Sequence, residues 1–174
     1  MAKAPSRELL VMRHAKSDRG VEVRRDFDRP LAKRGKKDSK RMGRWLKERK
    51  LRPDLVIASP AVRSRDTADR VAEVLGLDGD AIRREPRLYD APVERILRIL
   101  GEVPESAMRV LLVAHNPGLE DLVLHLGGDA VEIPGDGKVL PTGAVARFSM
   151  PADWGRLPAG AGVLRGIVRP RELG

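Results

Sequence analysis

An apolar run of strand length that stops at a histidine, Val110-Leu111-Leu112-Val113-Ala114-His115-Asn116-Pro117-Gly118, is the clearest guide to the fold. Leu9-Leu10-Val11-Met12-Arg13-His14-Ala15 has the same design, and Leu55-Val56-Ile57-Ala58-Ser59-Pro60 is a third such run. Continuous apolar runs of this length indicate strands buried on both faces, as in parallel sheets. We therefore expect three central strands whose carboxyl ends lie at one edge of a sheet, where open α/β sheets bind ligands.

Helix-like segments alternate with these strands. This alternation predicts a three-layer α/β/α sandwich with a mainly parallel central sheet, formed as a single domain over residues 1–174. Ile82 to Arg84 is a weak extended segment, and two late strands, Gly143 to Met150 and Val163 to Val168, could add antiparallel edges. Four helices are expected. The first carries Met42, Trp45 and Leu46, and the second runs from Val62 to Leu75. The third follows Pro92, and the fourth follows Pro117-Gly118.

Composition limits the location and the partners of the chain. It has 174 residues, no cysteine, and no stretch near the roughly 20 apolar residues that span a membrane. Its first eight residues are too polar for a signal peptide, so we expect a cytoplasmic protein without a membrane partner. The net charge of +9 favours anionic partners. Aromatic residues form only 3% of the chain, which makes nucleic acid an unlikely partner because bases need stacking surfaces.

The strongest charge run extends from Lys33 to Arg41. Such runs usually form the solvated face of a helix, and this is the structure that we predict for it. Attraction of an acidic protein partner is the alternative role.

Two imidazoles and two guanidiniums are expected to converge at the strand ends. His14 and His115 end two of the apolar runs, Arg13 precedes His14, and Arg63 follows the third run at the start of a helix. A neutral imidazole is a nucleophile near pH 7, while arginine stays charged and binds phosphate oxygens through two N–H groups. The pattern therefore predicts a site for a phosphoryl group.

The same residues carry a family resemblance. Met12-Arg13-His14-Ala15 resembles the Arg-His-Gly/Ala signature of the histidine phosphatase superfamily, which has the phosphoglycerate-mutase-like fold. The segments Ser59-Pro60-Ala61-Val62-Arg63 with Thr67-Ala68, and Val113-Ala114-His115-Asn116-Pro117, resemble its second and third blocks. Asp28-Arg29-Pro30-Leu31 with Gly35, the short chain, and Pro141-Thr142-Gly143-Ala144 are similar to the small SixA-type phosphohistidine phosphatases.

The resemblance implies roles for these residues. His14 is the expected nucleophile, Arg13 and Arg63 hold the transferring phosphoryl group, and His115 donates to its oxygens. A second set is expected to bind substrate, although each member also has a structural alternative in a loop or turn: Lys16, Ser17, Arg29, Thr142 and Gly143. His125 is expected to be non-catalytic.

The general acid is a gap in the pattern. Larger superfamily members use a glutamate, and the matching region Arg87-Leu88-Tyr89-Asp90-Ala91-Pro92 has none. Asp90 is the best candidate, although it could instead cap the helix after Pro92; Asp18 and Glu120 are further candidates. A site without a strong acid favours substrates with good leaving groups, such as phosphohistidine.

The predicted function is a phosphatase that acts through a phosphohistidine intermediate on His14, uses no metal or other cofactor, and releases inorganic phosphate. Its expected substrate is phosphohistidine on a protein. A small phosphate ester is the alternative substrate, while a mutase and a non-catalytic phosphate- or nucleic-acid-binding module are less favoured.

Overall fold

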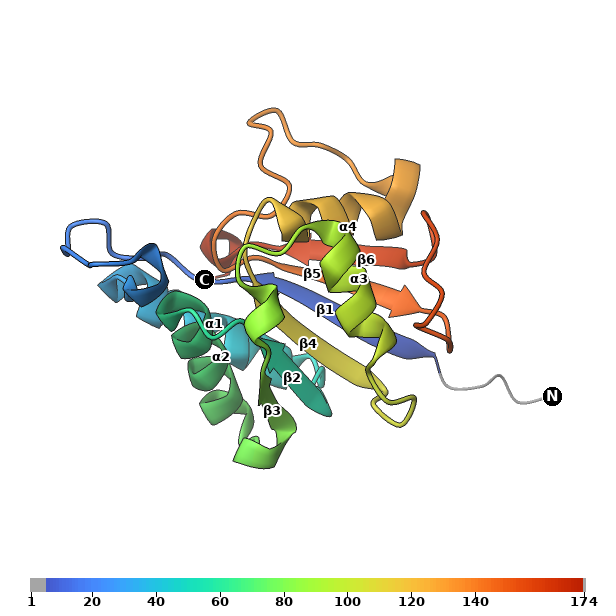
Figure 1. Cartoon of the computed structure of the whole chain (residues 1–174), viewed down its shortest axis with the longest axis horizontal. Helices are drawn as coiled ribbons and strands as arrows, with labels where there is room; N and C mark the ends of the chain where they lie inside the picture. The colour runs from blue at the N-terminus through green and yellow to red at the C-terminus, as the bar shows by residue number, and fades with distance from the viewer. Residues whose placement is uncertain (1–5, 174) are drawn as a thin grey trace.

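The computed structural model describes residues 6–173. Within them, six strands form one sheet in the order β3-β2-β4-β1-β5-β6 (Figure 1). The strands β3, β2, β4 and β1 run parallel, while β5 is antiparallel to β1 and β6 is antiparallel to β5. The predicted mainly parallel α/β fold is therefore confirmed. The strands are β1 (Arg7–Arg13), β2 (Leu55–Ala58), β3 (Ile82–Arg84), β4 (Arg109–Ala114), β5 (Val145–Met150) and β6 (Val163–Val168).

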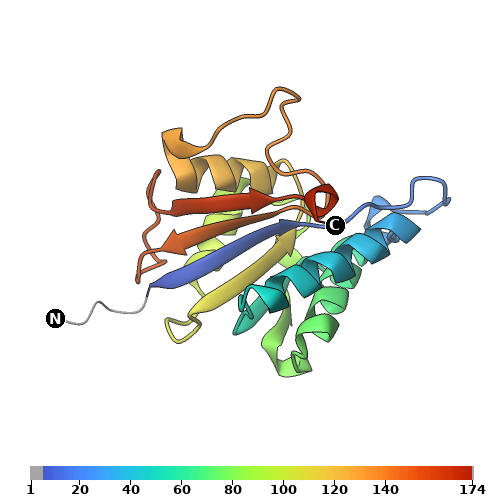
Figure 2. The ribbon, with the colours of Figure 1, turned by 180° about the vertical axis from the view of Figure 1, so that it is seen from behind.

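Four α-helices of the described chain cover the two faces of this sheet. Figure 1 shows α3 and α4 in front of the strands, and Figure 2 shows α1 and α2 across the opposite face. No helix in residues 6–173 is both long enough and apolar enough to cross a membrane. The helices are α1 (Lys33–Glu48), α2 (Val62–Leu75), α3 (Val93–Gly101) and α4 (Gly118–Gly127).

The central strands are apolar throughout because both of their faces are covered. Successive side chains of a strand point to opposite faces. In β1, Leu9 and Val11 enter the core beneath α3 and α4, whereas Leu10 and Met12 enter the core beneath α1 and α2. All four side chains are fully buried. The strand exits are thereby fixed between two packed layers.

Two of the predicted boundaries need correction. The strand predicted from Gly143 begins at Val145, because Gly143 has a left-handed backbone (φ 76°) and forms a turn. Its N–H donates to the carbonyl oxygens of Arg13 and His14, at 3.1 and 3.0 Å. Residues Asp26–Asp28, expected as loop, form one turn of 3₁₀ helix.

The charge run from Lys33 to Arg41 forms the first half of α1. Gly35, Asp38 and Ser39 face inward, while most of the basic side chains are exposed, as expected for a solvated helix face. Gly35 has a specific role, since a Cβ atom there would lie 2.1 Å from the carbonyl oxygen of Lys16. The glycine lets α1 approach the loop that follows β1.

Candidate active site

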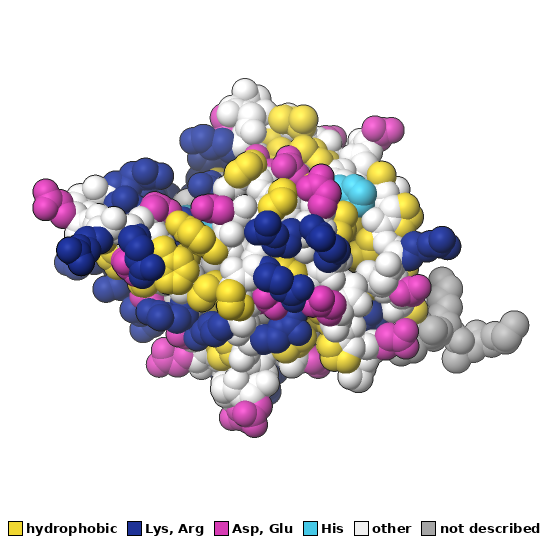
Figure 3. Space-filling view, viewed as in Figure 1, with side chains coloured by type: hydrophobic (Ala, Val, Ile, Leu, Met, Phe, Trp, Pro, Cys, Tyr) yellow, Lys and Arg dark blue, Asp and Glu magenta, His cyan; other side chains and the backbone are white. Residues whose placement is uncertain are grey.

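The carboxyl ends of the parallel strands surround a cavity of about 220 Å³, called the central cavity below. Figure 3 shows Lys and Arg side chains at the left, where β1 ends in the view of Figure 1, and a further group across the centre of this face. Nine of the residues predicted for the site line the cavity together with three that were not predicted. The predicted nine are Arg13, His14, Lys16, Ser17, Arg29, Arg63, Asp90, His115 and Thr142, and the others are Arg19, Asp26 and Asn116.

His14 is held in one tautomer at the exit of β1. Its backbone N–H donates to the carbonyl oxygen of Ala114, and its Nδ1 lies 2.8 Å from the carbonyl oxygen of Ala15. A carbonyl can only accept, so Nδ1 carries the proton and Nε2 keeps its lone pair. The Nε of Arg63 donates to this Nε2 over a long 3.4 Å. The unprotonated nitrogen of His14 is therefore the one on the side of Arg63.

Both histidines of the cavity are neutral near pH 7. Burial lowers the pKa of His14 to about 3, despite the hydrogen bond to Ala15, and His115, Arg63 and Arg13 add electrostatic repulsion. The pKa of His115 is lowered to about 4, first by burial and then by Arg63. Each ring is only 6% exposed, and the ring centroids are 5.3 Å apart. Neutral imidazoles keep a lone pair available for nucleophilic attack.

Arg63 lies in the first turn of α2 and is held by Asp26 and by Thr67. Its Nη1 and Nη2 donate to the backbone oxygen and to Oδ2 of Asp26, both at 2.8 Å. The hydroxyl of Thr67 donates to the carbonyl oxygen of Arg63 at 2.7 Å and accepts from the backbone N–H of Ala15 at 3.0 Å. Thr67 thus links the backbone of Arg63 to the residue after His14.

His115 is positioned by Ser59 at the exit of β2. The His115 Nε2 and the Ser59 hydroxyl are 2.7 Å apart, and the ring of Tyr89 meets His115 edge-on with centroids 5.6 Å apart. The buried Nδ1 of His115 has no partner within residues 6–173. One hydrogen-bonding position of the ring is therefore unfilled by the protein.

Arg13 brings a second cation to the cavity. Burial lowers its pKa, which nevertheless stays far above neutrality for a guanidinium. Its Nε is buried, and no hydrogen bond or ion pair within residues 6–173 engages the side chain. An anion in the cavity would supply the missing partner.

The residues expected to bind substrate fall into two groups. Lys16, Ser17, Arg29 and Thr142 line the cavity, and Arg29 also holds the loop through Asp26 Oδ1 at 3.4 Å. Gly143 does not line it, and its N–H is already used behind β1, so it is not available to a phosphate. The structure therefore places Gly143 in a turn, which was the alternative expected for it.

The candidate acids differ in their surroundings. Asp90 lies on the cavity wall and does not cap α3, whose preceding residue Pro92 provides no side-chain bond. Glu120 accepts from Asn116 Nδ2 and from the backbone N–H of Leu140, and so it supports a loop. Asp18 does not line the cavity and accepts from the N–H of Gly20.

Asp26 is the main residue that the sequence did not reveal. Burial alone would raise its pKa, but Arg63, Arg29 and Tyr89 lower it overall, so the side chain is a carboxylate and not a proton donor. It lies in a polar loop with no apolar period. The only signal for Asp26 in the sequence is that this carboxylate stands three residues before Arg29.

The same residues of the described chain do not form a recognisable metal site. Within residues 6–173, no group of three or more His, Asp or Glu side chains is arranged to hold an ion. The charged groups nearest to His14 are instead the two guanidiniums.

Known proteins are similar to this chain in sequence and in fold. The sequence profile of the histidine phosphatase superfamily (branch 1) matches residues 9–95, half of the chain. An uncharacterized protein of Mycobacterium tuberculosis, Rv1276c, is 31% identical over 164 residues, covering 92% of this chain and all of that protein. Phosphohistidine phosphatase SixA of Escherichia coli K12 is 32% identical over 123 residues, covering 68% of this chain and 73% of SixA.

A solved structure agrees with these matches. The protein histidine phosphatase SixA in complex with tungstate superposes with a TM-score of 0.79 at 26% identity, over 95% of this chain and 98% of that one. The family expected from the three sequence blocks is thus confirmed. The chain belongs to the histidine phosphatase superfamily.

Proposed function

We propose that this phosphatase removes phosphate from phosphohistidine on a protein, through a phosphoenzyme formed on His14. The observation that carries the proposal is the fixed tautomer of His14, which leaves Nε2 unprotonated on the side of Arg63. The superfamily membership and the likeness to SixA proteins support the same chemistry.

In the first step, Nε2 of His14 attacks the phosphorus atom while the bond from phosphorus to the leaving nitrogen breaks. The phosphoryl group is transferred, and the leaving imidazole takes up a proton from solvent or departs already protonated. Arg13 and Arg63 offset the negative charge on the phosphoryl oxygens. Arg63 gives up part of its contact with Asp26 to do so, and His115 contributes a hydrogen bond.

In the second step, water attacks phosphorus and the bond from phosphorus to Nε2 breaks. Inorganic phosphate leaves, the water proton ends on phosphate or in solvent, and Nε2 regains its lone pair. The hydrogen bond from Nδ1 to Ala15 holds the ring throughout. Arg13 and Arg63 supply the charge stabilisation, and we propose that no metal ion is needed.

The lack of a strong acid supports the choice of substrate. Asp26 is held ionised by Arg63, and Asp90 is the remaining carboxyl candidate on the wall, with no hydrogen bond or ion pair to its side chain among residues 6–173. An alkoxide leaving group would need a proton from a well-placed acid, whereas a protonated imidazole leaves without one. The site therefore suits phosphohistidine better than a sugar phosphate.

Trapping of the phosphoenzyme tests this function. The wild-type protein is mixed with a protein carrying labelled phosphohistidine and quenched in alkali, and the labelled histidine is mapped by mass spectrometry. We expect label on His14 and turnover of the substrate. The His14→Ala protein should form no phosphoenzyme and lose at least about 10⁴-fold in activity. His125→Ala is the matched control.

A second measurement separates the two substrate classes. Across a series of aryl phosphates, kcat/KM should fall steeply as the pKa of the leaving group rises, and Asp90→Asn should flatten or steepen that slope only if Asp90 is the acid. Equal rates on alkyl phosphates and activated esters would instead favour a small phosphate ester as substrate. Label on any residue other than His14 would refute the mechanism.

A further inference from the structure

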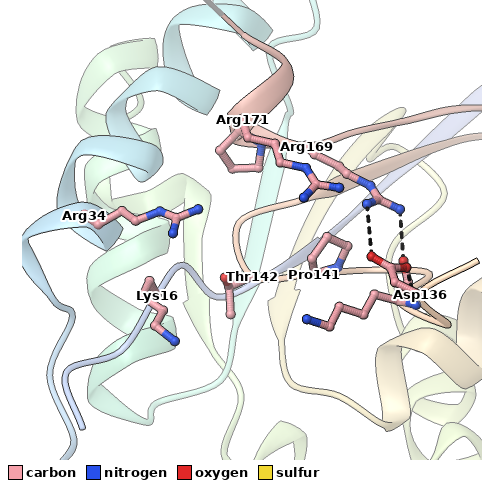
Figure 4. A pocket seen from close by; sticks show the side chains of 9 residues that line it. Lys16, Arg34, Asp136, Pro141, Thr142, Arg169 and Arg171 are labelled. Atoms are coloured by element: carbon pink, nitrogen blue, oxygen red, sulfur yellow. Dashed lines mark hydrogen bonds and ion pairs between the residues drawn. The ribbon is translucent and has the colours of Figure 1, made fainter. Parts of the chain in front are cut away.

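A second cavity, of about 290 Å³, adjoins the central cavity and is called the basic pocket below. Lys16 and Thr142 line both cavities, so the two share a wall. The basic pocket is built by the loop after β1, the start of α1, the loop before β5 and the segment after β6 (Figure 4). It does not contain His14, and the mechanism above leaves it unused.

The basic pocket holds an unbalanced set of charges. Among the described side chains that line it, five are cationic and Asp136 alone is acidic. Like charges gathered in one concave surface repel one another, and an anion between them relieves that repulsion. The five cations are Lys16, Arg34, Lys138, Arg169 and Arg171.

The single carboxylate is already occupied. Asp136 accepts from the backbone N–H of Lys138 at 2.9 Å and lies 3.9 Å from Nη1 of Arg169. The Nη2 of Arg169 also donates to the carbonyl oxygen of Lys138 at 3.0 Å, which fixes this arginine, only 13% exposed, as one wall. Asp136 therefore cannot neutralise the remaining cations.

Those remaining cations are free to bind a ligand. Within residues 6–173, no ion pair engages Lys16, Lys138 or Arg171, and Arg34 has only a 3.5 Å contact with Asp38 while staying 70% exposed. Figure 4 shows the guanidiniums of Arg171 and Arg169 beside one another on one side of the pocket, and Arg34 with Lys16 on the other side. Several guanidiniums that line one cavity can donate charge-assisted hydrogen bonds to an oxyanion held between them.

We propose that the basic pocket binds a second anionic group, a carboxylate or a phosphate, of the same substrate molecule whose phosphoryl group enters the central cavity. The proposal rests on the proposed function and narrows its substrate class. The shared wall at Lys16 and Thr142 is what joins the two sites. On a protein substrate, the second group is an acidic side chain near the phosphohistidine; on a small substrate, it is a second phosphate.

The first test uses ligands that cannot be hydrolysed. Binding of methylphosphonate and of alkane bisphosphonates of increasing length is measured by calorimetry. We expect the best bisphosphonate to bind at least about tenfold more tightly than methylphosphonate, which corresponds to one added charge-assisted contact. The Arg34→Gln/Arg171→Gln protein should lose most of that difference. Arg156→Gln, an exposed arginine in the β5–β6 loop at the opposite edge of the sheet, is the matched control.

The second test uses turnover. Two phosphohistidine peptides of equal length, one with Asp and Glu beside the phosphohistidine and one with Ser and Gln, are compared by kcat/KM. We expect the acidic peptide to be preferred about tenfold. The preference should fall in the Arg34→Gln/Arg171→Gln protein and in high salt, because exposed charges are screened.

The two tests identify the source of the second anion. An advantage confined to the peptides indicates acidic side chains, and one confined to the bisphosphonates indicates a second phosphate. The proposal is overturned if neither ligand set shows an advantage, or if the advantage survives the double substitution. Binding of phosphonates requires no turnover, so a protein that discriminates them but hydrolyses no phosphohistidine would refute the proposed substrate and not the basic pocket.

Discussion

The central cavity and the basic pocket share a wall but are built differently. In the central cavity, His14, Arg63 and His115 are each at most 7% exposed, and a fixed partner holds at least one polar atom of each side chain. In the basic pocket, most cations are exposed, and Arg169 alone is firmly held. Bond making needs groups fixed to a fraction of an ångström, whereas attraction of an anion tolerates mobile charges. We propose that the central cavity carries out the bond-making steps and that the basic pocket next to it attracts the second anionic group.

The sharpest way to break this comparison is to remove a fixed cation. Arg63→Gln is expected to lower kcat/KM about 10²- to 10³-fold, because one donor to the developing charge is lost. Arg63→Lys keeps the charge but loses the two N–H groups that donate to Asp26, and should recover only part of the activity. Steady-state kinetics with an aryl phosphate measure both. Full activity in Arg63→Lys would mean that charge alone matters in the central cavity.

Removal of a positioning residue tests whether fixation itself matters. Thr67→Val breaks the link between Ala15 and the backbone of Arg63, and we expect kcat to fall about 10- to 100-fold with a smaller change in KM. The unfolding free energy should fall by about 1–3 kcal/mol, since a buried N–H loses its partner.

Thr67→Ser keeps the hydroxyl and is the control for this variant. If Thr67→Val and Thr67→Ser lose stability equally while kcat is unchanged, Thr67 supports the fold and does not position the nucleophile.

The dependence of stability on acid pH tests the central cavity, because both of its histidines are buried. The pKa of His14 is about 3 and that of His115 about 4 in the folded chain, against about 6.5 when unfolded. Between these values the unfolded chain binds more protons, so the unfolding free energy falls as the pH drops below about 6.5. At about pH 5 the loss is on the order of 2 kcal/mol per histidine.

Urea denaturation at neutral and acid pH measures this loss. The His14→Gln/His115→Gln protein should be less sensitive to acid than the wild type. Equal sensitivity of the two proteins would mean that other groups carry the acid response.

The smallest expected effect is that of chelation. If the guanidiniums of the central cavity supply the positive charge, turnover in excess EDTA should equal turnover in buffer. Phosphatase assays before and after dialysis against EDTA measure this. A loss that Mg²⁺ or Mn²⁺ restores would show that Arg13 and Arg63 are not sufficient.

The sequence was a good guide wherever a residue follows a buried strand. His14 and His115 could be placed at one sheet edge because apolar runs define β1 and β4, and Arg63 because it begins a helix with a clear period. Asp26 could not, since its loop has no period and its partner is 37 residues away. A pattern along the chain records burial well, but it does not record which loops meet.

The basic pocket shows the same limit at a larger scale. Lys16, Arg34, Lys138 and Arg171 come from four segments whose proximity depends on the direction of β5 and β6. The sequence indicated an excess of positive charge and its densest run, but not where that charge gathers. For a related reason the sequence left open whether Gly143 binds substrate or forms a turn, because its N–H is used in a turn that only the packed sheet defines.

The position of β1 between β4 and β5 has a consequence for synthesis of the protein. Its pairing with β5 joins residues more than 130 positions apart, from Met12 with Val145 to Arg7 with Met150. The turn at Gly143 that closes behind His14 also belongs to this late segment. A ribosome therefore makes His14 and β1 more than 130 residues before the strand β5 that pairs with β1. The surroundings of His14 can form only after the turn at Gly143 and β5 have been made, however early β1 emerges.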